Sequence, residues 1–83
     1  MHEEKGKIVK KWIRPGDRNP NVNIYGIETD TGHIMETCGN YGNFQTYPDP
    51  IGDWEKLELG KAYVLVYGSK VSYPHDTLIG AQV

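Results

Sequence analysis

The soft metal ligands of this sequence are few, and their spacing is poor for a metal site. They are three histidines and one cysteine, namely His2, His33, His75 and Cys38. A structural zinc site needs four good ligands, commonly in closely spaced pairs, and no such pair occurs here. His33 and Cys38 are five residues apart, so on one strand they would point to opposite faces. We therefore expect no metal and no cofactor, and we interpret Cys38 as a small buried hydrophobe.

Nucleophilic catalysis would need Cys38 or a serine with a base in reach. The two serines, Ser69 and Ser72, lie in no recognisable nucleophile motif. The aspartates fall in turn-like or cap-like contexts, where aspartate is common for structural reasons. The glycine-rich run at 39–43 lacks the lysine and the following helix of a phosphate-binding loop. The sequence therefore predicts a binding protein and not an enzyme.

A group of aromatic residues is the first candidate for a binding surface. Tyr41, Phe44 and Tyr47 recur at a spacing of three within the irregular stretch from Gly39 to Gly52. Such a stretch is long for a small domain, where connections of about 4–6 residues are usual. Exposed aromatic side chains can anchor a protein partner or stack on nucleobases. They can equally fold back and close one end of the domain, and the sequence leaves that alternative open.

A second candidate set combines basic and aromatic residues that the expected strand order would gather around one face. Its members are Arg14, Arg18, Tyr25, His33, Lys70 and Tyr73. Such a face could bind single-stranded nucleic acid, because cations that contact phosphates release counterions. The chain has 11 acidic and 9 basic residues and a net charge of -2, which favours a protein partner. A small molecule or nucleotide is a further possible ligand.

Five stretches with strand-like patterning must position these residues. They span 6–14, 22–29, 33–38, 61–67 and, with a break at Pro74, 69–83. A single helical turn capped by Asp53 is predicted at 54–57, between the third and fourth stretches. Pro15 and Gly16 fit the centre of a type II turn, with the glycine at positive φ. Residues 30–32 fit a short hairpin connection with Gly32 in the left-handed position.

This order predicts one all-β domain over residues 1–83, a small five-stranded antiparallel barrel of the OB-like type. An SH3-like barrel is the alternative, but the helical turn before the fourth strand favours the OB-like order. The expected core comprises Ile8, Val22, Ile24, Ile34, Leu57, Leu65 and Val71.

The start of the chain, Met1 to Lys5, has no apolar stretch typical of a signal peptide. The longest apolar run is far too short for a membrane span, and a single cysteine cannot form an internal disulfide. We therefore expect a cytoplasmic protein that has no contact with a membrane.

Residues 57–68 read Leu-Glu-Leu-Gly-Lys-Ala-Tyr-Val-Leu-Val-Tyr-Gly. An apolar residue, then Gly-Lys-x-Tyr and an alternating strand that ends in glycine resemble the fourth strand of many small OB-like domains. The opening Gly6-Lys7-Ile8-Val9 is similar to the first strand of such domains. Small proteins of phages and prophages often look like this. The resemblance implies the fold and suggests a small accessory or inhibitor protein, and it transfers no catalytic residue.

Overall fold

The computed structural model describes residues 1–38, 49–69 and 74–83. These residues form five strands and one short helix, with the helix between the third and fourth strands. The elements are β1 (His2–Pro15), β2 (Asn23–Thr29), β3 (Ile34–Thr37), α1 (Pro50–Lys56), β4 (Ala62–Gly68) and β5 (Asp76–Gln82). The expected mostly β domain with one helical element before the fourth strand is therefore confirmed.

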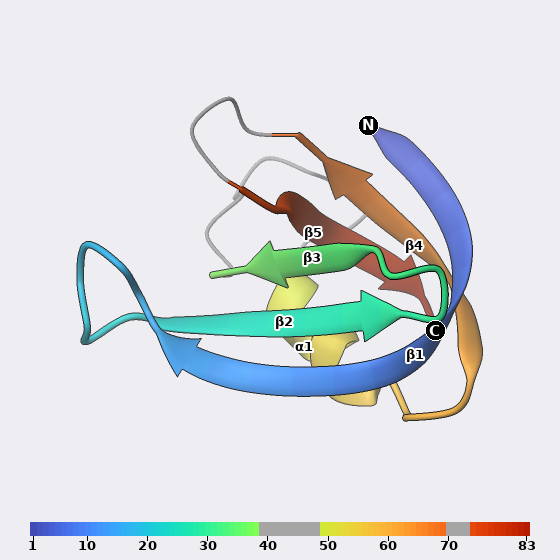
Figure 1. Cartoon of the computed structure of the whole chain (residues 1–83), viewed down its shortest axis with the longest axis horizontal. Helices are drawn as coiled ribbons and strands as arrows, with labels where there is room; N and C mark the ends of the chain where they lie inside the picture. The colour runs from blue at the N-terminus through green and yellow to red at the C-terminus, as the bar shows by residue number, and fades with distance from the viewer. Residues whose placement is uncertain (39–48, 70–73) are drawn as a thin grey trace.

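The strand pairings form a closed ring in the order β1-β2-β3-β5-β4, with β4 returning to β1 (Figure 1). Four of the pairings are antiparallel, and β3 and β5 run parallel. The expectation of a wholly antiparallel sheet is wrong for a geometric reason. Strand direction cannot alternate all the way round a ring with an odd number of members, so one seam must be parallel. Within the described part of the chain, that seam holds the two pairs Met35↔Asp76 and Glu36↔Thr77.

The long first strand serves two neighbours in turn. Residues 2–7 pair with β4, and residues from Ile8 to Pro15 pair with β2. The register shifts between Ile8 and Lys10, which marks a bulge at the point where the partner changes. A bulge increases the local twist of a strand, and Figure 1 shows β1 curving around the sheet.

The core lies inside the ring, and α1 covers one end of it. Its buried members are Ile8, Ile27, Met35, Trp54, Leu57, Leu65, Leu78 and Ala81. Trp54, on α1, donates from its indole nitrogen to the carbonyl oxygen of Gly26 at 2.9 Å, so the large ring is buried without an unsatisfied polar atom. Lys11 adds to this contact, with its amine 4.0 Å from the centre of the Trp54 ring.

The cap of α1 differs from the expected one. Asp49, and not Asp53, caps the helix, because its side chain accepts a hydrogen bond from the Gly52 amide at 2.9 Å. Pro50 starts the helix at a position where no amide hydrogen is needed. Asp53 lies inside the first turn and accepts a hydrogen bond from the Ala81 amide at 3.1 Å, which ties α1 to β5.

Two other expectations are corrected. Positive φ occurs, among the described glycines, at Gly32 and Gly60, so the type II turn with Gly16 at positive φ is wrong. The Gly16 amide instead donates to the Val22 carbonyl at 2.7 Å and closes the loop between β1 and β2. Val22 is 40% exposed in that loop and is not a core residue.

The other expected core positions divide into three groups. Ile8, Leu57 and Leu65 are buried in the core cluster, as expected, whereas Ile24 is buried outside that cluster, opposite Arg14. Ile34 is half-buried, and Val71 lies outside the described residues. The hairpin glycine, Gly32, has the expected left-handed conformation with φ of 82°.

Within the described ranges, no helix has the length and apolar character needed to cross a membrane.

Candidate binding face

Trp12 lies against the backbone of the neighbouring strand. It pairs with Gly26 across β1 and β2. A Cβ atom added at Gly26 would lie 2.2 Å from both Cε2 and Nε1 of Trp12, so the ring occupies the space of the missing side chain. Trp12 itself is half-buried. The absence of a side chain at position 26 therefore lets the indole pack directly on the backbone of β2 while part of the ring stays accessible to solvent.

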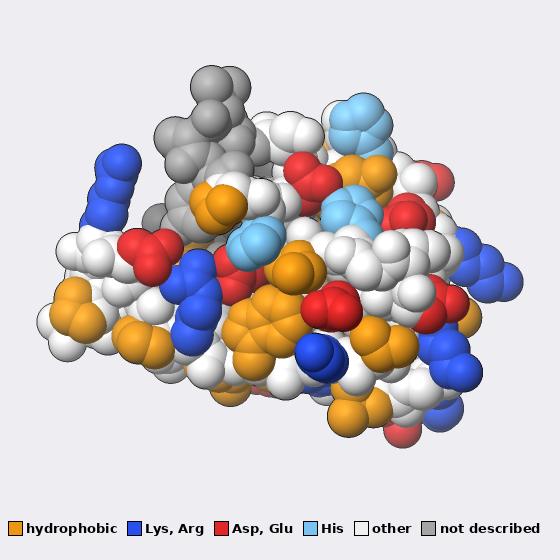
Figure 2. Space-filling view, in the orientation of Figure 1, with side chains coloured by type: hydrophobic (Ala, Val, Ile, Leu, Met, Phe, Trp, Pro, Cys, Tyr) orange, Lys and Arg blue, Asp and Glu red, His pale blue; other side chains and the backbone are white. Residues whose placement is uncertain are grey.

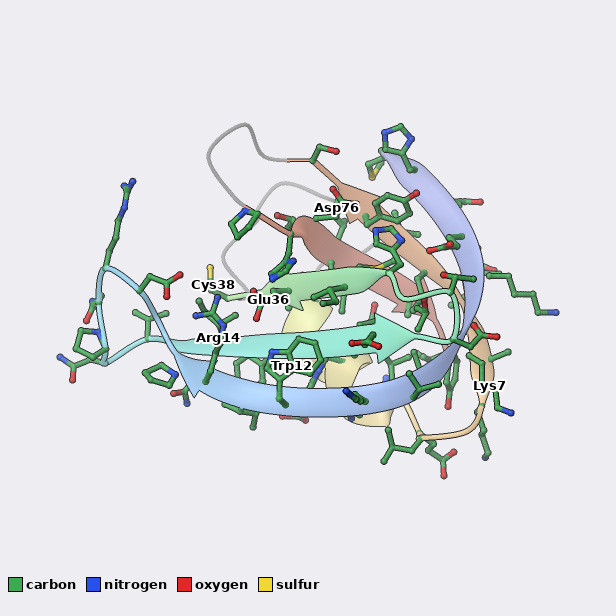
Figure 3. All side chains as sticks on the ribbon, viewed as in Figure 1. Lys7, Trp12, Arg14, Glu36, Cys38 and Asp76 are labelled. Atoms are coloured by element: carbon green, nitrogen blue, oxygen red, sulfur yellow. The ribbon has the colours of Figure 1, made fainter. Side chains whose placement is uncertain are left out.

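A buried carboxylate fixes the position of this ring. Glu36, on β3, is 5% exposed. Its Oε2 accepts hydrogen bonds from the indole nitrogen of Trp12 at 2.9 Å and from Nε of Arg14 at 2.7 Å. Its Oε1 accepts from Nη2 of Arg14 at 2.9 Å, which makes the guanidinium contact bidentate. Figure 3 shows the three labelled side chains converging across β1, β2 and β3.

The charges in this cluster compensate one another. Hydrogen bonds from Arg14 hold the pKa of Glu36 below its ordinary value, although burial opposes that effect. Hydrogen bonds to Glu36 and then to Asp17 raise the pKa of Arg14 further above its ordinary value. Arg14 also forms an ion pair with Asp17, 3.0 Å from Nη1 to Oδ1. The Arg14 guanidinium is therefore paired with two carboxylates, those of Glu36 and Asp17.

Alternation along the strands places further side chains beside Trp12. We call the set the Trp12 face: Lys10, Trp12, Arg14, Glu28, Ile34 and Glu36. Lys10 pairs with Glu28, and Glu28 pairs with Ile34 on the next strand. In Figure 2 apolar atoms lie in the middle of this side of the molecule, bordered by basic and acidic side chains. The face has two basic and two acidic members and thus no net charge.

The residues predicted to form a basic and aromatic site do not gather as expected. Arg14 is on the Trp12 face, but its guanidinium is paired, and Arg18 is exposed in the loop after β1. Tyr25 packs against the core, with its ring centre 5.0 Å from that of Trp54 in an edge-to-face contact, so it is not part of the expected binding face. His33 bridges two carboxylates, Glu4 and Asp76. The remaining predicted residues, Tyr41, Phe44, Tyr47, Lys70 and Tyr73, lie outside the described residues.

Sequence reasoning missed the two residues at the centre of the face, Trp12 and Glu36. A signal for Trp12 was present, because Trp12 shares a strand face with Arg14 and β2 carries a glycine. The register that sets Trp12 opposite Gly26 comes from the bulge at Val9, which the sequence pattern does not reveal. The burial of Glu36 has no sequence signal, since it depends on two donors from another strand.

A hollow lies between α1 and the end of β5, and two of its carboxylates already have structural roles. Its lining includes Asp49, Asp53 and Glu55. Asp49 caps the helix, and Asp53 accepts a hydrogen bond from Ala81. Across residues 1–38, 49–69 and 74–83, no group of three or more histidine, cysteine or acidic side chains is placed to hold a metal ion. The Trp12 face is therefore the better candidate.

Comparison of the chain with protein-family models, with curated proteins and with solved structures finds no match.

Proposed function

We propose that this protein is a non-catalytic binding module that docks a segment of another protein on the Trp12 face. The observation that carries the proposal is the placement of Trp12, held by Glu36 and seated on Gly26 with part of its surface accessible. A partner that covers this ring would meet a side chain that is already ordered. Little conformational entropy would then be lost at the contact.

The composition of the face favours protein over nucleic acid. Tryptophan and arginine are enriched among residues that dominate protein–protein binding energy. Phosphate binding draws on free cations, whereas Arg14 is saturated by Glu36 and Asp17. Lys11 donates to the Leu57 carbonyl at 2.9 Å and is also engaged. The apolar centre with its compensated polar border resembles the core and rim of a protein interface.

The fold supports the choice of face. We propose that the closed ring is an OB-like barrel, on the strength of its helix between β3 and β4 and its long shared first strand. In OB-folds ligands bind on the face of the second and third strands and on the adjoining loops. The Trp12 face contains residues of β2 and β3 beside those of β1. The narrower role of a phage-type accessory or inhibitor protein rests on the sequence resemblance alone.

Single-stranded nucleic acid is the second candidate, and one observation favours it. An accessible indole next to Lys10 is a platform on which a base can stack, worth about 1–3 kcal/mol per base. The two candidates differ in their dependence on salt. Binding through phosphates weakens steeply as salt rises, whereas docking on a face with no net charge changes little.

The test is a binding comparison between the wild-type protein and Trp12→Ala. Labelled single-stranded DNA and RNA are titrated by fluorescence anisotropy at low and high salt, and proteins are captured from nuclease-treated extract. The proposal expects salt-resistant protein capture that Trp12→Ala abolishes and that Leu59→Ala retains. Leu59 is a matched control because it is an exposed apolar residue outside the face, in the turn before β4. Salt-sensitive oligonucleotide binding without protein capture would establish the second candidate instead.

A further inference from the structure

His33 lies between two carboxylates on different strands. Its Nδ1 is 2.5 Å from Oε2 of Glu4, on β1, and its Nε2 is 2.6 Å from Oδ2 of Asp76, the first residue of β5. The His33 ring packs edge-on against Tyr67, on β4, with the ring centres 4.6 Å apart. A single side chain just before β3 thus contacts β1, β4 and β5.

The two carboxylates are themselves oriented by hydroxyl groups. Thr31 donates to Oε1 of Glu4 at 3.4 Å, and Ser69 donates to Oδ1 of Asp76 at 3.2 Å. Each carboxylate therefore keeps one oxygen for His33. The side chains of His33, Glu4 and Asp76 are 21%, 27% and 30% exposed, so water screens the cluster only in part.

The number of N–H donors on the ring decides which protonation form of His33 fits this geometry. A neutral imidazole has one N–H and one acceptor nitrogen, whereas an imidazolium donates from both nitrogens. Carboxylates accept hydrogen bonds and do not donate them, so only the imidazolium satisfies both contacts. Partial burial alone would lower the pKa of His33, but the hydrogen bonds that the ring donates to Glu4 and Asp76 outweigh it and raise the pKa above its ordinary value.

The cluster lies beside the seam between β3 and β5, so the protonation of His33 bears on how these two strands are held together. Among the described residues the parallel seam between β3 and β5 has two residue pairs, and Asp76 belongs to one of them. His33 immediately precedes β3, so its bond to Asp76 is a side-chain tie across the seam that has the fewest pairs among the described residues. Its bond to Glu4 ties the same point to the first half of β1, which pairs with β4 and not with β2.

We propose that His33 is a proton-dependent latch on the seam between β3 and β5. While both ring nitrogens carry protons, the imidazolium holds Asp76 and Glu4 and the seam stays closed. When one proton is lost, one carboxylate loses its donor and the seam opens locally. The proposal is independent of what binds to the Trp12 face.

The direction of the pH dependence follows from linkage. A histidine whose pKa is higher in the folded state than in the unfolded state stabilises the fold below the unfolded pKa, ordinarily about 6.5. That stabilisation is lost as the pH rises through the folded pKa. The seam should therefore be best protected in mildly acidic solution and should loosen on the alkaline side of the His33 midpoint.

The first test uses the wild-type protein. NMR titration of the histidine ring signals gives the His33 midpoint, and amide hydrogen exchange gives protection factors at 35–37 and 76–78 as a function of pH. We expect a midpoint above about 6.5. Seam protection should fall by up to about tenfold for each unit by which the folded midpoint exceeds that of the unfolded chain. A midpoint below the ordinary value, or protection that does not change across the midpoint, would overturn the proposal.

Two variants separate the latch from general destabilisation. His33→Gln should lose the pH dependence at the seam, whereas His2→Gln should keep it. His2 is a matched control, because its ring also packs on Tyr67, with the centres 5.4 Å apart, and it bridges no carboxylates in the described structure. If His33→Gln does not fold, Asp76→Asn serves in its place and should lower the His33 midpoint. An unchanged midpoint in Asp76→Asn would contradict the latch.

Discussion

Trp12 fills the volume that a side chain on Gly26 would occupy, across the boundary between β1 and β2. The distance from a Cβ at position 26 to the indole would be 2.2 Å, far below any van der Waals contact. Trp12 on one strand therefore requires glycine on the next. The accessible ring at the centre of the candidate binding face is the product of this pair.

Replacing Gly26 by alanine should displace the Trp12 ring from its position against β2. The Cβ would force Trp12 off the backbone and away from Glu36, which is buried and accepts its indole hydrogen bond. Overpacking of this kind typically costs about 1–3 kcal/mol. We expect Gly26→Ala to lose that much free energy of unfolding, as measured by urea denaturation.

A double-mutant cycle checks that the clash with Trp12 is the cause. In a Trp12→Ala background the added methyl group has room, so Gly26→Ala should cost much less than in the wild-type protein. Equal costs in both backgrounds would show that the glycine is needed for another reason.

Arg14→Ala should leave the buried carboxylate of Glu36 without its main partner. Removing one member of a fully buried pair costs about 3–5 kcal/mol. The Arg14 side chain is 31% exposed, so screening reduces this, and we expect about 2 kcal/mol near neutral pH. Asp17→Ala is the control, because Asp17 is 67% exposed and its pair with Arg14 should contribute little.

The cost of Arg14→Ala should also depend on pH. Arg14 holds the pKa of Glu36 below its ordinary value, so this stabilisation is present above the unfolded pKa of about 4.3 and is lost as the pH falls through the lower, folded pKa. The difference in unfolding free energy between wild type and variant should therefore shrink in acid. A difference that stays constant from neutral pH to about pH 3 would contradict the role given to Glu36.

Asp49→Ala should destabilise the helix that covers the core. The substitution removes the acceptor for the Gly52 amide, and loss of such a cap typically costs about 1 kcal/mol. Glu55→Ala, at an exposed position of the same helix, should change the unfolding free energy by less than about 0.5 kcal/mol. Thermal unfolding followed by circular dichroism measures both. An equal effect of the two substitutions would argue against Asp49 as the cap.

Much of the strand layout could be predicted from the sequence, because β-branched and aromatic runs bounded by glycine and proline are local signals. The register could not, since it depends on a bulge at Val9 that no local pattern marks. Tyr25 shows the consequence. It shares a strand face with Ile27, which is fully buried, and it packs against the core. The expected core contained Val22 and Ile24, and that choice placed Tyr25 on the outer side of the sheet, which is wrong.

The candidate site was predictable only in part for a related reason. Arg14 was found because a basic residue near a loop is visible in the sequence. Its saturation by Glu36 was not, because the two residues are 22 positions apart and meet through pairings of β1 with β2 and of β2 with β3. The His33 cluster has the same origin, with partners 29 and 43 residues away.

Site-specific photo-crosslinking in the cell that makes the protein tests the central claim most directly. A photoreactive phenylalanine analogue replaces Lys10, which is exposed and lies on the Trp12 face, or Leu59, which lies outside it. The account predicts a discrete, protease-sensitive and nuclease-resistant product from position 10, absent from position 59 and lost when Trp12→Ala is added. Equal crosslinking from both positions, or a product from position 10 that survives Trp12→Ala, would contradict it.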